Sequence, residues 1–259
     1  MRIGAYQFAV SGSIENNYLT IQKAIMLAIE KRVQLIVFPE CALTGYPPRD
    51  LIDSSVVEFD VLSSIYDRLQ FIVDRYNIHV IVGSIIEDEG SYYNCALCFS
   101  PKKDRQVYYK RALWGWDADN FSARESKGVF NIHDWKIGVR ICFEIRFPEF
   151  FRELYSETTD LNVILFYDVS GENDRERYNL IDSHIRTRAV ENVTHTLTVN
   201  AISPYQTAPT ILYDRSGRIL CEAKRNEEGL LVYDLFKEKM DFGELGRKEI
   251  SDRLLKGRV

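Results

Sequence analysis

Short apolar runs rich in β-branched residues alternate with longer amphipathic runs along this chain. The short runs predict strands at 2–9, 33–38, 78–86, 92–99, 105–110, 136–142, 161–167, 195–201, 208–213, 217–223 and 229–234. The longer runs repeat apolar residues at helical spacing and predict helices at 16–32, 56–76, 148–156 and 175–193. Polar turns between some strands predict hairpins at 86–92, 100–105 and 214–217. Together these patterns predict an α/β fold in which helices cover a mixed sheet.

The chain is predicted to form one domain over residues 1–259. It contains no Pro/Gly/Ser-rich linker, no low-complexity stretch and no internal repeat that would mark a boundary. Single α/β domains of this size are common. Residues 235–259 are polar and charged, and we interpret them as a C-terminal arm.

The composition of the chain argues against some classes of function and favours one cellular compartment. Hydrophobic residues make up 46% and charged residues 27%, which is ordinary for a globular protein with a sizeable core. A net charge of −5 argues against nucleic acid as the main partner, because phosphate binding needs a basic surface. No apolar stretch approaches the roughly 20 residues of a membrane span. Five cysteines, an odd number, favour reduced thiols and a cytoplasmic protein.

Three chemically reactive side chains come at the ends of predicted strands. Glu40 follows an apolar strand in the run Phe-Pro-Glu, Lys110 ends another in Tyr-Lys, and Cys142 ends a third. After Cys142 the chain continues Phe-Glu-Ile-Arg-Phe-Pro-Glu, which reads as a turn and the start of a helix. A thiol beside a helix N-terminus is expected to be stabilised as the thiolate.

These motifs resemble the Glu, Lys and Cys motifs of the nitrilase superfamily, the carbon–nitrogen hydrolases. The resemblance covers most of the chain. It continues through Arg-Ala-Val-Glu-Asn at 188–192 and into the late hairpin at 213–220. It implies a four-layer αββα sandwich of two mixed sheets flanked by helices. It also implies that no metal or organic cofactor is required, and that the C-terminal arm packs on a partner subunit of a homodimer or larger oligomer.

By the same resemblance, the protein is expected to be a thiol hydrolase that cleaves the C–N bond of a small, non-peptide amide. Glu40 would accept the proton of Cys142, and the thiolate would attack the amide carbon to form a thioester. Lys110 and the backbone N–H of Phe143 would stabilise the oxyanion. Water would then hydrolyse the thioester to a carboxylic acid, after ammonia or an amine has left. Hydrolysis of a nitrile is a less favoured alternative.

A second carboxylate of the family pattern is altered in this chain. Where the family carries Glu-x-x-x-Phe-x-x-Gly, this sequence has Asp117 at the glutamate position and Arg124 at the glycine position. Asp117 is therefore the candidate that holds Lys110 and positions water. Asp119 and Glu125 are the competing carboxylates if the register slips.

Aromatic residues near the strand ends are candidates for binding substrate. Tyr46 and Trp116 follow the Glu40 and Lys110 motifs, and Phe143 follows the nucleophile. Ordinary packing explains such aromatic residues equally well. Nearby Glu144, together with Arg146 and Glu149, is interpreted as part of a supporting ion-pair network.

Three other functions remain possible from the sequence. The thioester could pass its acyl group to an amine, which would make the protein an acyltransferase. A cysteine–histidine hydrolase would need a base such as His133, the histidine nearest to Cys142 in sequence. A non-catalytic family member could keep the fold as a binding or regulatory protein.

Overall fold

The computed structural model describes residues 1–257 and contains two six-stranded sheets. The strands of the first sheet are β1 (Arg2–Gln7), β2 (Leu35–Val37), β3 (His79–Asp88), β4 (Ser91–Phe99), β5 (Gln106–Tyr109) and β14 (Gly229–Asp234). Those of the second are β6 (Val129–Ile132), β7 (Trp135–Ile141), β8 (Leu161–Phe166), β10 (His195–Asn200), β12 (Ile211–Tyr213) and β13 (Ile219–Glu222). Their spatial orders are β14-β1-β2-β3-β4-β5 and β13-β12-β10-β8-β7-β6. Each sheet combines parallel and antiparallel pairs.

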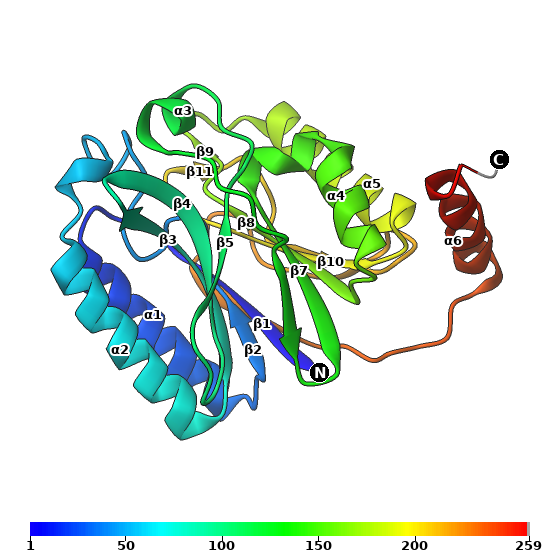
Figure 1. Ribbon diagram of the computed structural model, residues 1–259, viewed down its shortest axis with the longest axis horizontal. Coiled ribbons are helices and arrows are strands. Elements are labelled where there is room, and N and C mark those ends of the chain that lie inside the picture. The colour runs from blue at the N-terminus through cyan, green and yellow to red at the C-terminus, as the bar shows by residue number, and fades with distance from the viewer. Residues whose placement is uncertain (258–259) are drawn as a thin grey trace.

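Helices cover the outer face of each sheet. On one side lie α1 (Ile14–Glu30) and α2 (Phe59–Tyr76), and on the other α4 (Pro148–Ser156) and α5 (Arg175–Glu191), with the sheets between them (Figure 1). Shorter elements are η1 (Ser54–Val56), α3 (Trp116–Asn120), η2 (Cys142–Arg146) and the small sheet of β9 (Val169–Ser170) with β11 (Tyr205–Gln206). The arrangement confirms the expected αββα sandwich.

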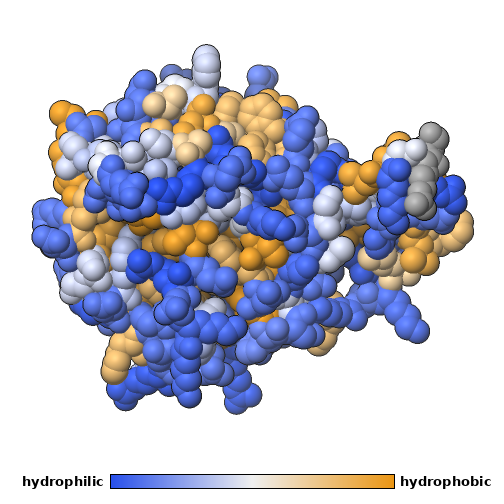
Figure 2. Space-filling view, in the orientation of Figure 1, coloured by the Kyte–Doolittle hydropathy of each residue, from blue (hydrophilic) through white to orange (hydrophobic). Residues whose placement is uncertain are grey.

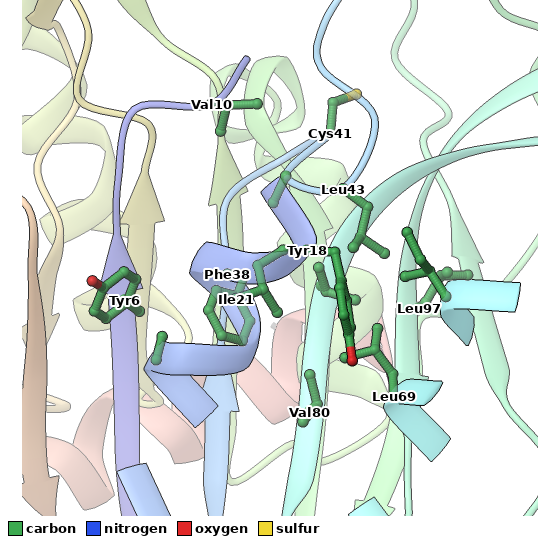
Figure 3. Close-up of a cluster of buried hydrophobic side chains, with 14 of the residues drawn as sticks. Tyr6, Val10, Tyr18, Ile21, Phe38, Cys41, Leu43, Leu69, Val80 and Leu97 are labelled. Atoms are coloured by element: carbon green, nitrogen blue, oxygen red, sulfur yellow. The ribbon is translucent and has the colours of Figure 1, made fainter. Parts of the chain in front are cut away.

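Strands buried on both faces explain the continuous apolar runs in the sequence. In β2, Leu35 and Val37 join the core between the two sheets, whereas Ile36 joins the core beneath the helices. Tyr18 of α1 and Val80 of β3 both belong to that outer core (Figure 3). Burial of each such side chain contributes about 1.5–3 kcal/mol to stability, so both cores hold the strand ends in fixed positions.

Most predicted elements are present, with differences at the edges. The helix at 148–156 matches α4, and the three predicted hairpins are formed by β3–β4, β4–β5 and β12–β13. The sequence prediction missed β6, β9, β11 and α3, and it made the strand at 208–213 longer than β12. These missed elements are only two to five residues long, too short for a clear periodic pattern.

The predicted C-terminal arm contains a helix, α6 (Phe242–Leu255), which follows a long connection at the end of the chain (Figure 1). It contacts the sandwich through the Tyr155 hydroxyl of α4, which donates to Asp252, and through the ion pair of Arg215 with Glu244. It carries exposed apolar side chains, among them Phe242 at 94% and Leu254 at 59% exposure, and the space-filling view shows hydrophobic atoms on this lobe (Figure 2). The last two residues of the predicted arm lie outside the described part of the chain. Among the helices of residues 1–257, none is long and apolar enough to cross a membrane.

One glycine lets the segment that carries Glu40 approach β3. The N–H of Gly83 donates to the carbonyl of Pro39 at 3.1 Å, which fastens the segment to the strand. A Cβ at Gly83 would lie 2.3 Å from that carbonyl oxygen and 2.6 Å from the Cα of Glu40. Any larger residue at this position must therefore displace the backbone of Glu40.

We expect Gly83→Ala to destabilise the fold and to displace Glu40, because overpacking at a fixed backbone contact costs about 1–3 kcal/mol. Chemical denaturation measures the stability. Gly229→Ala is the matched control, since a Cβ at that strand glycine meets nothing within 4 Å. Equal stability of the two variants would contradict the close-approach explanation.

Candidate active site

Glu40 lies beyond the end of β2 and is fully buried. Its Oε1 accepts hydrogen bonds from Lys110 Nζ and from Asn94 Nδ2, each at 2.7 Å. Its Oε2 accepts the backbone N–H of Tyr167 at 2.9 Å, from the chain that follows β8 in the second sheet. Burial raises the pKa of Glu40, against the lowering effect of the Lys110 charge. A carboxylate with a raised pKa is better suited to exchange protons near neutral pH.

Lys110 follows β5 directly and bridges two buried carboxylates. Its Nζ lies 2.7 Å from Glu40 Oε1 and 2.7 Å from Asp117 Oδ2. Burial alone would lower the pKa of the ammonium, but the charges of Glu40 and Asp117 outweigh it and hold the pKa well above its ordinary value. The other oxygen of Asp117 accepts the hydroxyl of Tyr46 at 2.9 Å. Lys110 therefore stays charged.

The structure brings only one of the three candidate carboxylates to Lys110. Asp117 is 5% exposed and contacts the ammonium directly. Asp119 is exposed, and the side chain of Glu125 is 93% exposed and faces Arg111. The register with Asp117 at the glutamate position is the one that the geometry supports.

Cys142 directly follows β7 and begins the 3₁₀ turn η2, with a positive φ of 44°. Such a φ is strained for a residue with a side chain and is common at functional sites. Burial, followed by the negative charge of Glu40, raises the pKa of the Cys142 thiol well above its ordinary value. This direction runs against the expectation that the neighbouring helix end stabilises a thiolate, because desolvation and nearby carboxylates favour the neutral thiol.

The three aromatic candidates differ in position. Tyr46 is buried, stacks on Tyr167 with 5.1 Å between ring centroids, and donates to Asp117. Trp116 is 50% exposed at the start of α3, and Phe143 is partly exposed beside Cys142. The structure thus ties Tyr46 to the carboxylate network and leaves the other two near the surface.

The four histidines of the chain do not lie beside Cys142. His133 is in the turn before β7, whereas Cys142 follows that strand, and the seven residues of β7 span roughly 23 Å at about 3.3 Å per residue. The ring of His133 instead lies 5.0 Å from that of His79. His195 begins a strand parallel to β8, which is itself parallel to β7, and the half-buried His184 lies on α5. This geometry excludes His133 as the base.

Several groups at the site were not found from the sequence. Asn94 lies in the middle of β4 and supplies a hydrogen bond to Glu40, as does the peptide N–H of Tyr167.

The expected ion-pair role of Glu144 is wrong, because its carboxylate accepts hydrogen bonds from a tyrosine hydroxyl and two backbone N–H groups. A buried asparagine or glutamate inside an apolar run was the available signal, since such residues are rarely buried without a partner.

A further ion pair, between Asp168 and Arg177, lies after the carboxyl end of β8, and Cys142 follows the carboxyl end of the parallel strand β7. The carboxylate of Asp168 accepts two hydrogen bonds from Arg177, at 3.0 and 3.1 Å. The negative charge of Asp168 also contributes to the raised pKa of Cys142. Within residues 1–257 there is no group of three or more His, Cys, Asp and Glu side chains that could hold a metal ion.

Comparisons with known proteins agree with this architecture. A family model described as carbon-nitrogen hydrolase matches residues 2–241. The 2-oxoglutaramate amidase of Bacillus subtilis is 25% identical over 88% of both chains. The omega-amidase NIT2 of Xenopus tropicalis is 29% identical over 60% of this chain and 59% of its own length. A glutamine-dependent NAD(+) synthetase of Aquifex aeolicus is 24% identical over 93% of this chain, which spans only 42% of that relative.

Solved structures share the fold. An amidase from Nesterenkonia sp. has a TM-score of 0.79 and 22% identity, covering 91% of this chain and 90% of its own. A cysteine-to-alanine mutant of the amidase from Nesterenkonia sp. AN1, in complex with butyramide, has a TM-score of 0.82 and 20% identity. The alignment with that mutant covers 100% of this chain and 97% of the other.

We expect Asp117→Asn to move the acidic limb of the pH profile of kcat/KM to lower pH. Burial raises the pKa of Glu40 above its ordinary value of 4.5, and the charge of Asp117 adds to the rise. Activity that needs ionised Glu40 appears as pH increases through that raised pKa. Removal of the Asp117 charge lowers the pKa and so shifts the limb downward.

The control for this experiment is Glu125→Gln, which removes a carboxylate from an exposed side chain. Its profile should match that of the parent protein. An unchanged or upward-shifted limb in Asp117→Asn would contradict the assigned coupling between Asp117 and Glu40.

Proposed function

The chain belongs to the carbon–nitrogen hydrolase family, and we propose that it hydrolyses a small, non-peptide carboxamide through a thioester on Cys142. The observation that carries this proposal is the contact of Lys110 with both Glu40 and Asp117, at 2.7 Å each. These groups are close enough to Cys142 for their charges to affect its pKa. A nucleophile, a base and a fixed cation are the parts that amide cleavage requires.

In the proposed acylation, Glu40 accepts the proton of the Cys142 thiol as sulfur attacks the carbonyl carbon. An ammonium has three N–H donors, and Lys110 directs two of them to carboxylates. The third, with the N–H of Phe143, stabilises the oxyanion. Glu40 then returns the proton to the leaving nitrogen. The C–N bond breaks, ammonia departs, and the acyl group remains on sulfur.

In the proposed deacylation, Glu40 removes a proton from water as the water oxygen attacks the thioester carbon. The C–S bond breaks, sulfur regains the proton, and the carboxylic acid leaves. The sum of both stages is amide plus water giving acid plus ammonia. Asp117 keeps Lys110 in place through both stages, because its carboxylate remains bonded to Nζ.

The names of related proteins support an amide as the substrate. Omega-amidase and 2-oxoglutaramate amidase are among the sequence relatives, and butyramide is bound in the Nesterenkonia sp. AN1 mutant. Another structure of that enzyme carries acrylamide added to the active-site cysteine. These names define a first substrate panel of butyramide, 2-oxoglutaramate and other short amides.

We expect the parent protein to release ammonia from one or more of these amides, and Cys142→Ala to release none. Intact-mass spectrometry of the parent should show an acyl adduct that the variant lacks. Cys221→Ala is the matched control, because Cys221 is the other cysteine with intermediate exposure. Its activity should equal that of the parent.

Ammonia release that survives in Cys142→Ala would overturn the thioester mechanism. Addition of an amine separates hydrolysis from acyl transfer: an acylated amine as the main product identifies a transferase. Stable binding of an amide by the parent, with neither an adduct nor ammonia, identifies a non-catalytic binding protein.

We also propose a cytoplasmic homodimer. Free thiols at all five cysteines support the compartment, and the exposed apolar side chains of α6 support association through the C-terminal arm. Truncation after residue 240 should then reduce the mass measured by light scattering from that of a dimer to that of a monomer. A monomeric parent protein would contradict the association.

A further inference from the structure

Glu144 is a buried acidic residue that the proposed reaction leaves unused. It lies in η2, two residues after Cys142, and is fully buried. Its Oε1 accepts the hydroxyl of Tyr108 at 2.7 Å and the backbone N–H of Arg111 at 2.9 Å. Its Oε2 accepts the backbone N–H of Ile141 at 2.7 Å. Three donors on one buried carboxylate form a strong and directional contact.

Two of those donors are the peptide groups next to the reactive side chains. The N–H of Arg111 directly follows Lys110 at the end of β5, in the first sheet. The N–H of Ile141 directly precedes Cys142 at the end of β7, in the second sheet. One carboxylate thus joins the strand end that carries the ammonium to the strand end that carries the thiol.

We propose that Glu144 is a positioning residue that sets the separation and direction of Cys142 relative to Lys110. This inference rests on the proposed function for its effect on turnover, while the geometry itself is independent of the reaction. No backbone hydrogen bond of a sheet ladder crosses between the two packed sheets. Their relative shift therefore depends on side-chain contacts and on a few backbone contacts outside the ladders, such as that of the Glu40 N–H with the carbonyl of Phe166 at 3.3 Å. The Glu144 carboxylate supplies a fixed polar link at the point where placement affects the chemistry.

The carboxylate is the only common side chain of this length that fits these donors. All the donors approach as N–H or O–H groups, and each carboxylate oxygen accepts without donating. In Glu144→Gln, one oxygen becomes an NH₂ group that must face at least one peptide N–H, at Ile141 or at Arg111. That strand end then loses its partner. A displacement of about 1 Å in such a site can reduce the rate roughly 100-fold.

The test compares Glu144→Gln with Tyr108→Phe. The second variant removes one hydrogen bond to the same carboxylate but leaves both peptide N–H contacts in place, which makes it the matched control. Thiol titration with mass detection counts the reactive Cys142 in each preparation, and kcat is divided by that count. A loss of folded protein therefore does not register as a loss of catalytic efficiency.

We expect kcat per titrated thiol to fall roughly 100-fold in Glu144→Gln, with KM within about threefold of the parent value. Tyr108→Phe should stay within about threefold in both parameters. A purely structural role would lower the unfolding temperature and the number of reactive thiols, with kcat per thiol unchanged. A kcat per thiol within twofold of the parent would overturn the proposal.

A second readout does not depend on amide hydrolysis. The rate of Cys142 modification is measured with iodoacetamide, whose carbonyl oxygen can meet Lys110, and with methyl methanethiosulfonate, which has no carbonyl group. Their ratio cancels changes in thiol exposure and should fall at least tenfold in Glu144→Gln. An unchanged ratio would overturn the positioning role, even if the parent protein hydrolyses no amide and the proposed function fails.

If Glu144→Gln does not fold, Glu144→Asp replaces it. Its carboxylate is one methylene shorter and cannot reach both strand ends from the same backbone position. The ratio of the two modification rates should fall in this variant as well. A parental ratio in Glu144→Asp would show that contact with both strand ends is unnecessary, and would overturn the proposal.

Discussion

A buried ammonium held between two buried carboxylates is the interaction on which the rest of the site depends. Each of these charges would cost several kcal/mol to bury alone, and that cost is offset only by close pairing and by further hydrogen bonds. Lys110 contacts one oxygen of Glu40 and one of Asp117 at 2.7 Å each, and Asn94 donates to the same Glu40 oxygen. The Tyr46 hydroxyl and a backbone N–H satisfy the other oxygen of each carboxylate. The backbone donor comes from beyond β8, so the site is complete only when both sheets are packed together.

The same charges govern the state of the nucleophile. Around Lys110 the formal charges of Glu40 and Asp117 leave a net negative centre, and burial of Cys142 beside it raises the thiol pKa. A neutral resting thiol avoids a third buried anion near Asp117. The Cys142 thiol can lose its proton without adding a further negative charge only if a nearby carboxylate accepts that proton. Glu40 is the nearby carboxylate whose raised pKa favours its acceptance of the proton. Burial raises the pKa of both the Cys142 thiol and the Glu40 carboxylate, and so makes Glu40 a suitable base for this nucleophile.

The sequence predicted elements with strong periodicity and the polar residues placed at their ends. Strands such as β2 are apolar on both faces because two cores enclose them, and this pattern is readable without a structure. Cys142, Glu40 and Lys110 were found because each follows such a run. Asn94 was missed because it lies inside a strand, where its role depends on the contact with Glu40 across the sheet. The short helix α3 has too few residues to show a period, although it positions Asp117.

Two buried glutamates show how surroundings, and not residue type, determine a role. Glu40 accepts a hydrogen bond from the charged Lys110 and lies near the Cys142 thiol, so its carboxylate is placed to exchange a proton with that thiol. Glu144 is enclosed by a tyrosine hydroxyl and two peptide N–H groups, all of which donate to it. Peptide donors cannot move without moving the strands. Acceptance of their hydrogen bonds therefore converts the charge of Glu144 into a constraint on backbone position, whereas the charge of Glu40 remains available for chemistry.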